Sequence, residues 1–121
     1  MAKRHDLRQR YMEGWYEMDI EKLQSSVAPG FVFDDPVEPE PVTRDMLAGY
    51  MERWDRRTRA AGSTNEWLLT DHVRKDKDGV LTDWSEWALV GTALRGMELV
   101  KTTDEGVLLE RITYFDRETG E

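Results

Sequence analysis

The chain has 121 residues, which is enough for one ordinary domain with its own apolar core. It contains no Cys, and this excludes disulfides, thiolate metal ligands and a catalytic thiol. The formal net charge of −8 argues against nucleic acid as a partner, because phosphate binding relies on a basic surface.

Helical spacing dominates the first part of the chain. Between His5 and Asp19 the apolar residues recur every three or four positions, which predicts an amphipathic helix. Asp19 is then the expected cap of a short second helix over residues 20–27. Pro29-Gly30 is a breaker, and Phe31-Val32-Phe33 predicts a short strand.

A proline-rich segment leads into a third predicted helix. Pro36, Pro39 and Pro41 favour an extended backbone. Thr43 reads as the cap of the helix, and Gly62 as the residue that ends it. The last turns of this helix carry a basic cluster, which we interpret as a solvated helix end and not as a phosphate site. The cluster consists of Arg53, Arg56, Arg57 and Arg59.

After Gly62 the apolar period changes from helical spacing to alternation. Strands are expected over residues 67–73, 80–90, 94–103 and 107–116. Turn residues separate them, at Lys77-Asp78-Gly79 and Asp104-Glu105-Gly106. Helices followed by an antiparallel meander predict an α+β fold, with residues 1–121 forming a single domain. Helices on one face of a twisted sheet would make a cone whose mouth is a pocket.

Two short signatures fit this order of elements. They are Phe33-Asp34-Asp35-Pro36 and Asp104-Glu105-Gly106 with the later Tyr114-Phe115-Asp116. Together with the element order they resemble the NTF2-like superfamily, in its SnoaL-like and ketosteroid isomerase-like branch. The resemblance covers nearly the whole chain. It implies three N-terminal helices packed on a curved antiparallel sheet that encloses a pocket.

Local matches to the ketosteroid isomerases imply a set of site residues. Gln9-Arg10-Tyr11 resembles the segment with the phenolic oxyanion donor. Asp35-Pro36-Val37, followed by Glu40-Pro41, resembles the segment with the catalytic base. The register of the later strands puts Glu98 where that family has a second, protonated acid, although the family has Asp there. The resemblance thus implies Asp35 as base, with Tyr11 and Glu98 as oxyanion donors.

Each of the three residues also has a simpler interpretation. Tyr11 shares a helical stripe with Trp15, so by itself it reads as a core aromatic. Asp35 before a proline is a common turn residue. Glu98 alternates with apolar residues on one strand face, so its carboxyl group must be protonated, paired with a buried Arg, or solvated by a pocket. The expected walls of a pocket for a flat apolar ligand are Trp15, Tyr50, Trp54 and Trp87.

Two further polar residues lie on the first long strand. Asp71 falls between Leu69 and Val73, so it is either a second pocket acid or a paired surface residue. His72 alternates away from Trp67 and Leu69, so we expect it to face outward or to lie at an interface.

The family resemblance implies a cofactor-independent isomerase that shifts a double bond by enolising a ketosteroid-like carbonyl compound, with no metal. Several alternatives remain open. A SnoaL-like polyketide cyclase would use an acid and a base in the same way. A dehydratase of this fold would need a pocket His paired with Asp, and His72 is expected to point the wrong way. An epoxide hydrolase would need an Asp-Arg-Asp set that this chain matches poorly. The chain could also be a non-catalytic module that binds a ligand or forms dimers.

The expected partner is a small apolar molecule of the steroid or polycyclic carbonyl class, with no nucleic acid and no membrane. Apolar residues on both faces of the meander predict a homodimer through the outer face of the sheet. They include Trp84, Trp87, Met97 and Leu99. No apolar run is long enough to span a membrane and no apolar stretch follows Met1, so we expect a cytoplasmic location.

Overall fold

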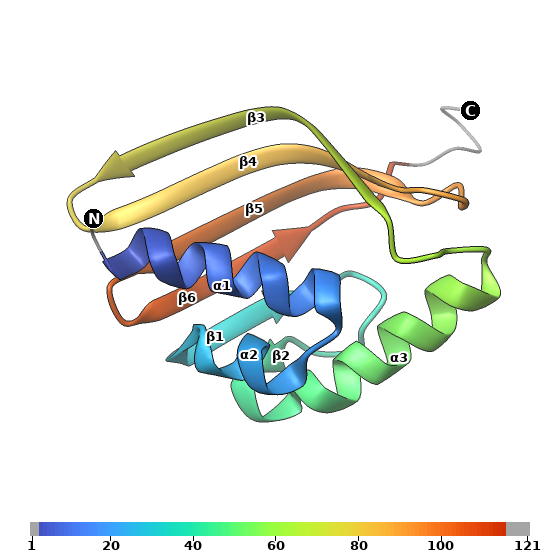
Figure 1. The fold of residues 1–121 in the computed structure, drawn as a ribbon, viewed down its shortest axis with the longest axis horizontal. Coiled ribbons are helices and arrows are strands. Elements are labelled where there is room, and N and C mark those ends of the chain that lie inside the picture. Colours follow the sequence, from blue (N-terminus) through green and yellow to red (C-terminus); the bar gives the residue numbers. More distant parts are fainter. Residues whose placement is uncertain (1–2, 116–121) are drawn as a thin grey trace.

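Three helices lie on one face of a strongly curved sheet in the computed structural model, which describes residues 3–115 (Figure 1). The elements in chain order are α1 (Lys3–Glu17), α2 (Ile20–Ser25), β1 (Val27–Asp34), β2 (Val42–Thr43), the 3-10 helix η1 (Arg44–Met46), α3 (Leu47–Ala60), β3 (Trp67–Lys77), β4 (Val80–Leu89), β5 (Arg95–Thr103) and β6 (Gly106–Ile112). The predicted α+β class and the order of the main elements are confirmed.

The sheet has six strands in the order β2-β1-β6-β5-β4-β3. The meander from β3 to β6 is antiparallel, as predicted. However, β1 runs parallel to β6, so the sheet is mixed and not wholly antiparallel. The cause is topological: the meander leaves one edge of β6 unpaired, and β1 arrives there directly from α2. A parallel pair needs a long connection, which α3 and the meander supply.

Several boundaries differ from those predicted. The second helix ends at Ser25, because the Ser26 hydroxyl donates a 2.6 Å hydrogen bond to the Leu23 carbonyl and closes the last turn. The first strand therefore starts at Val27 and is longer than residues 31–33. The last strand ends at Ile112, and the predicted end at Asp116 lies outside the described residues.

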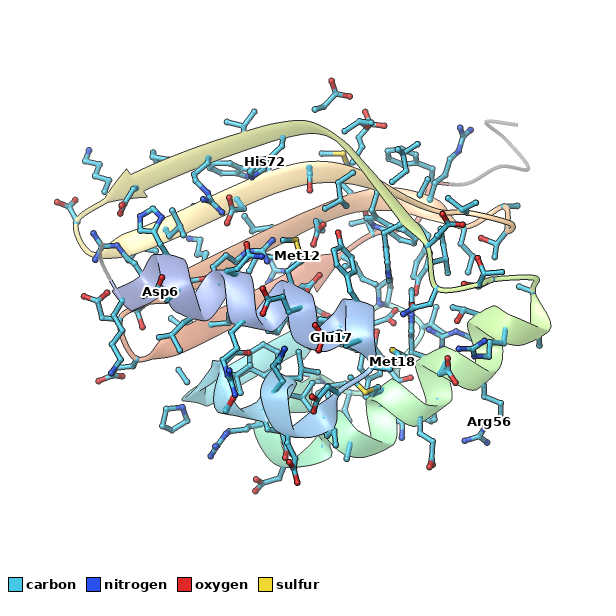
Figure 2. The ribbon with its side chains drawn as sticks, in the orientation of Figure 1. Asp6, Met12, Glu17, Met18, Arg56 and His72 are labelled. Atoms are coloured by element: carbon cyan, nitrogen blue, oxygen red, sulfur yellow. The ribbon has the colours of Figure 1, made fainter. Side chains whose placement is uncertain are left out.

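Helix α1 presents one face to the sheet. Its buried residues are Arg8, Tyr11 and Gly14, which recur at helical spacing. Figure 2 shows Met12 pointing from α1 toward the sheet, whereas Arg56 on α3 points away from the molecule. A Cβ atom at Gly14 would come within 2.9 Å of the Leu23 backbone, so the missing side chain lets α1 and α2 touch.

A β-bulge in β3 changes which side chains face the helices. Asp71 has a positive φ of 53°, and the pairing of β3 with β4 shifts register between Thr70 and Val73. One extra residue moves the following side chains to the opposite face. His72 therefore turns to the inner face, contrary to the predicted outward direction, although its side chain remains 49% exposed. Asp71 itself is exposed, in line with the surface interpretation and not with a pocket acid.

Gly96 on β5 offers a test of how closely the end of the sheet is packed. A Cβ atom there would lie 1.7 Å from the Thr113 carbonyl oxygen, so Gly96→Ala must displace backbone. We expect it to lower the free energy of unfolding by about 2 kcal/mol or more in urea titrations. Gly30→Ala is the control, because no atom lies within 4 Å of a Cβ at Gly30. Equal stability of the two variants would contradict the described packing.

Candidate functional site

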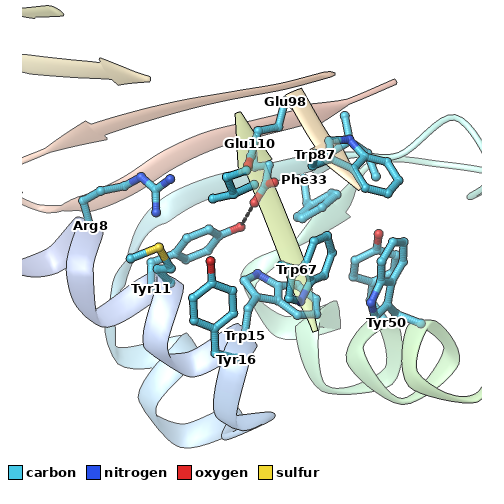
Figure 3. A pocket seen from close by; sticks show the side chains of 14 residues that line it. Arg8, Tyr11, Trp15, Tyr16, Phe33, Tyr50, Trp67, Trp87, Glu98 and Glu110 are labelled. Atoms are coloured by element: carbon cyan, nitrogen blue, oxygen red, sulfur yellow. Dashed lines mark hydrogen bonds between the residues drawn. The ribbon is translucent and has the colours of Figure 1, made fainter. Parts of the chain in front are cut away.

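A cavity of about 60 Å³ lies between α1, α3 and the inner face of the sheet (Figure 3). One end is polar and the other aromatic. Its lining residues are Arg8, Tyr11, Met12, Trp15, Tyr16, Phe33, Tyr50, Trp54, Trp67, Leu69, Trp87, Glu98, Glu110 and Ile112. This is the combination of an apolar wall and a few convergent polar groups that is typical of ligand sites.

Two carboxyl groups and a phenol form the polar end. Glu98 pairs across the sheet with Ile112, and Glu110 with Val100, so the two glutamates are diagonal neighbours on the inner face. The Tyr11 hydroxyl, which comes from α1, donates a hydrogen bond to Glu110 Oε1 (Figure 3). Ser85 Oγ donates to Glu98 Oε1 at 3.2 Å. Helix and sheet therefore meet through these groups.

The environment drives Glu110 toward its protonated form. Burial raises the pKa of Glu110 well above its usual range, and the neighbouring Glu98 carboxylate raises it further. The hydrogen bond from Tyr11 and the charge of Arg8 act in the opposite direction but are outweighed. Burial, together with Glu110, also raises the pKa of Tyr11, so the phenol keeps its proton. The polar end thus pairs a carboxyl group that is driven toward its neutral form with a second carboxyl group.

Closely packed aromatic rings form the other end. Trp54 and Trp67 stack with ring centroids 5.7 Å apart, and Trp87 meets both edge-on. The four predicted wall residues, Trp15, Tyr50, Trp54 and Trp87, all line the cavity. The buried indole N–H groups of Trp15, Trp54 and Trp67 have no hydrogen-bond acceptor within residues 3–115. Such packed, polar-edged rings suit a flat apolar ligand.

Asp35 is not brought to this cavity. Its side chain is fully buried behind Tyr50, whose hydroxyl donates to Asp35 Oδ2 at 2.5 Å. Tyr114 donates to both carboxylate oxygens, at 3.1 and 3.2 Å, and Arg57 lies 3.4 Å from Oδ2. The Val37 N–H donates to Oδ1 within the same turn. The expected single pocket for Tyr11, Asp35 and Glu98 is therefore wrong with respect to Asp35, which has a closed set of partners.

Part of the basic cluster on α3 belongs to this network and is not a solvated helix end. Arg53 Nη2 lies 2.6 Å from Glu38 Oε1, and Arg57 lies beside both Asp35 and Glu38. Arg56, by contrast, is largely exposed. The ion pairs tie the proline-rich segment to α3 behind the aromatic wall.

A second cavity, of about 260 Å³, adjoins the first. It is lined by Arg8, Gln9, Met12, Leu69, His72, Arg74 and Ser85. Beneath it lies the buried carboxylate of Asp83, which accepts hydrogen bonds from His72 and Arg74 at 2.7 Å and from Arg8 at 3.1 Å. Burial acts to raise the pKa of Asp83, but the hydrogen bonds from Arg74 and His72 outweigh it and hold this pKa below its usual value.

Glu110 and Arg8 are the main site residues that the sequence analysis missed. Glu110 shares its strand face with Ile112, a pattern visible in the sequence, but a bulge near Leu108 breaks the alternation with Val107. Arg8 lies three residues before Tyr11, so helical spacing could have placed it on the same face. A charged residue on a buried stripe was the available indication.

Within residues 3–115 no group of three or more His, Cys, Asp or Glu side chains is arranged to hold a metal ion. None of the helices in that range is both long and apolar enough to cross a membrane.

Comparison with known proteins identifies the fold. No protein-family model matches the sequence, and a search of curated proteins finds no relative. Among solved structures, an NTF2-like protein of unknown function from Cytophaga hutchinsonii is similar, with a TM-score of 0.61, 10% identity, and coverage of 97% of this chain and 94% of that one. Cystatin-like fold proteins match as well. The chain therefore has the NTF2-like, or cystatin-like, fold, as the resemblance implied.

Two similar structures carry functional descriptions. A candidate ketosteroid isomerase from Kribbella flavida has a TM-score of 0.61 and 15% identity, over 95% of this chain and 78% of that one. A candidate polyketide cyclase from Xanthomonas campestris has a TM-score of 0.61 and 16% identity, over 98% of this chain and 93% of that one. At such identities the likeness concerns the fold and leaves the activity to be argued from the site.

The raised pKa of Glu110 leads to a prediction about how stability depends on pH. The unfolded chain releases this proton near pH ~4.3, whereas the folded chain keeps it, because the folded pKa is raised. The contribution of Glu110 to the free energy of unfolding is therefore fully present below that pH. It is lost as the pH rises toward the folded pKa, by up to about 1.4 kcal/mol per pH unit. Glu110→Gln removes this loss, since its amide oxygen can still accept from Tyr11.

Urea unfolding between about pH 5 and about pH 8 tests the assignment, in the range where the carboxyl linkage acts. Relative to the unsubstituted protein, Glu110→Gln should become progressively more stable as the pH rises. Glu105→Gln, at an exposed position in the turn before β6, should show no such trend. A constant difference between Glu110→Gln and the parent across this range would mean that Glu110 is ionised when folded.

Proposed function

We propose that the chain binds a small apolar carbonyl compound and moves a proton next to its carbonyl group, without a metal or an organic cofactor. One observation carries the proposal: two adjacent carboxyl groups line one cavity, and one of them has a strongly raised pKa and is bound by a phenol. Pairs of titratable groups whose environments separate their protonation states are typical of acid–base sites.

In the proposed reaction, Glu98 is the base and Glu110 the acid. The Glu98 carboxylate takes a proton from the carbon beside the carbonyl, and Glu110 donates its hydrogen bond, or its proton, to the carbonyl oxygen as negative charge develops there. Glu98 then returns its proton to a conjugated carbon, which shifts the double bond, or to the same carbon, which gives exchange alone. As the carbonyl re-forms, any proton that Glu110 gave to the oxygen goes back to Glu110, so both carboxyl groups regain their starting states. Tyr11 positions Glu110 through the hydrogen bond that its hydroxyl donates.

The aromatic end would hold the carbon skeleton. Trp15, Tyr50, Trp54 and Trp87 contribute flat surfaces, and burial of a planar ligand against them supplies affinity without directional bonds. The rings pack against each other, so the wall is already formed before a ligand arrives.

Asp35 has a different place in this proposal from the one that the resemblance implied. Its carboxylate already accepts from Tyr50, Tyr114 and a backbone N–H, and it does not line the cavity. A general base must reach the proton it removes, directly or through one water. We therefore assign the base to Glu98, and to Asp35 the support of Tyr50 in the aromatic wall.

Solvent deuterium exchange beside the carbonyl of small aromatic and alicyclic ketones tests the activity. Glu98→Gln should lower the exchange rate at least about a hundredfold, because an amide cannot act as the base. Asp35→Asn should lower the free energy of unfolding, since it disturbs a buried hydrogen-bonded group, yet leave most of the exchange rate in the folded fraction. NMR measures the exchange rate, and urea titration measures the free energy of unfolding.

Glu105→Gln is the matched control, an exposed glutamate on the same hairpin as Glu110. If Asp35→Asn abolishes exchange and Glu98→Gln does not, the base is Asp35. If no ketone exchanges faster than the buffer background while ketones still bind, the chain is a ligand-binding module without this activity.

We also infer a homodimer through the outer face of the sheet, as the sequence predicts. No helix covers this face in the described chain, whereas α1 covers the other (Figure 1). Val73 and Trp84 are cross-strand partners there and are 57% and 36% exposed, and the next partner of Trp84 is Leu99. Of the apolar residues expected on the two faces of the meander, Trp87 is buried and lines the cavity on the inner face. A row of exposed apolar residues across strands is typical of an interface.

Trp84→Arg tests the dimer. A charge in the middle of the row should shift the protein from dimer to monomer at micromolar concentration in sedimentation equilibrium, with little change in its fold by circular dichroism. Glu105→Arg, which places the same charge in a turn, should leave the dimer intact. A monomeric parent protein would refute the interface.

A further inference from the structure

Arg8 is a buried guanidinium with unused donors. The residue is only 8% exposed, although arginine is rarely buried without full pairing. Its Nε donates to Asp83 Oδ2 at 3.1 Å. The terminal nitrogens Nη1 and Nη2 donate no hydrogen bond to any group within residues 3–115. That outer edge of the guanidinium is a fork that matches a carboxylate.

The unused edge lies where the two cavities meet. Arg8, Met12 and Leu69 line both of them. Figure 3 shows the Arg8 guanidinium directed toward the polar end of the first cavity, on the side of Tyr11 and Glu110. Arg8 is close enough to act on the pKa of both groups. A ligand that extends from one cavity into the other must therefore pass this guanidinium.

The second cavity has the charge that an anion requires. Arg8, Arg74 and His72 line it, together with the polar side chains of Gln9 and Ser85, and no Asp or Glu is among its lining residues. Asp83 lies beneath and neutralises part of this charge, and Glu98 lies beyond Ser85 on the side of the first cavity. The net charge of −8 repels anions from a distance, so a site of this kind depends on short-range hydrogen bonds.

The volumes of the two cavities also favour a ligand that occupies both of them. The first cavity, at about 60 Å³, is far below the roughly 300 Å³ at which ordinary ligand pockets begin. The adjoining cavity of about 260 Å³ brings the combined space close to that bound. A ligand that fills both would place its apolar carbonyl part against the aromatic wall and a second group beside Arg8.

We propose that the ligand carries a carboxylate and that the Nη1–Nη2 edge of Arg8 binds it at the junction of the two cavities. The substrate class is then an apolar keto acid, not a neutral ketone. Only the statement about the reacting carbonyl rests on the proposed function; the binding of the carboxylate does not require any turnover.

Isothermal titration calorimetry with three acids and their methyl esters tests the proposal. Benzoylpropionate, naphthoate and cyclohexylacetate keep the apolar part of each pair and change only the charge. The acids should bind at least about tenfold more tightly than their esters, the scale of one hydrogen-bonded charge pair. Added salt should weaken the acids and leave the esters almost unchanged. Equal binding, tighter ester binding, or no acid binding at millimolar concentration overturns the proposal.

Variants then assign the preference to Arg8. Arg8→Gln should bring the ratio of acid to ester affinity close to one. Because this change strands the buried Asp83 carboxylate, the double variant Arg8→Gln with Asp83→Asn is measured in parallel, and circular dichroism verifies its fold. Arg10→Gln, on the exposed side of the same helix, should keep the preference. Retention of the preference in a folded Arg8 variant overturns the assignment.

The two proposals can fail separately. If neutral ketones exchange deuterium and acids gain no affinity, the carboxylate site is wrong and the acid–base site stands. If acids bind through Arg8 and no ketone exchanges, the carboxylate site stands and the acid–base activity is wrong.

Discussion

A carboxyl group inside a protein must find partners for its charge or give the charge up, since an isolated buried ion is too costly to keep. The inner face of this sheet and the turn beside it meet that constraint in several ways. Asp83 keeps its charge under two arginines and a histidine, and Asp35 is enclosed by two phenols, an arginine and its own turn. Glu110 becomes neutral beneath Tyr11. Glu98, with one serine donor and a cavity in front of it, is left with capacity for a ligand.

Local rules explain why most of the fold could be predicted. Helical spacing placed α1, Asp19 does cap α2 by accepting from the Lys22 N–H at 3.1 Å, and the turn at Asp78-Gly79 joins β3 to β4. These patterns depend on neighbours in the sequence. The pairing of β1 with β6 joins residues some eighty positions apart, such as Phe33 with Glu110, and no local pattern encodes it. The mixed sheet therefore became apparent only from the structure.

The site was harder to predict because alternation fails at bulges. One extra residue at Asp71 returns His72 to the inner face, where the sequence period had excluded it. Another irregularity, near Leu108, hid the inward position of Glu110. The resemblance, in turn, gave Asp35 a role that its surroundings do not support, because Tyr50 fills the space between its carboxylate and the cavity. A motif fixes a residue's place in the chain, but its neighbours decide what it can reach.

Helix α1 connects the two polar regions. Arg8 and Tyr11 are three residues apart and so lie on the same face of one rigid helix. The first is anchored to Asp83 and the second to Glu110, on strands at different positions in the sheet. A displacement of α1 along its axis would lengthen both bonds together. The contact of the Gly14 backbone with Leu23 limits such a displacement, because no side chain separates α1 from α2 there. The position of one helix therefore sets both the phenol that bonds Glu110 and the guanidinium at the junction of the cavities.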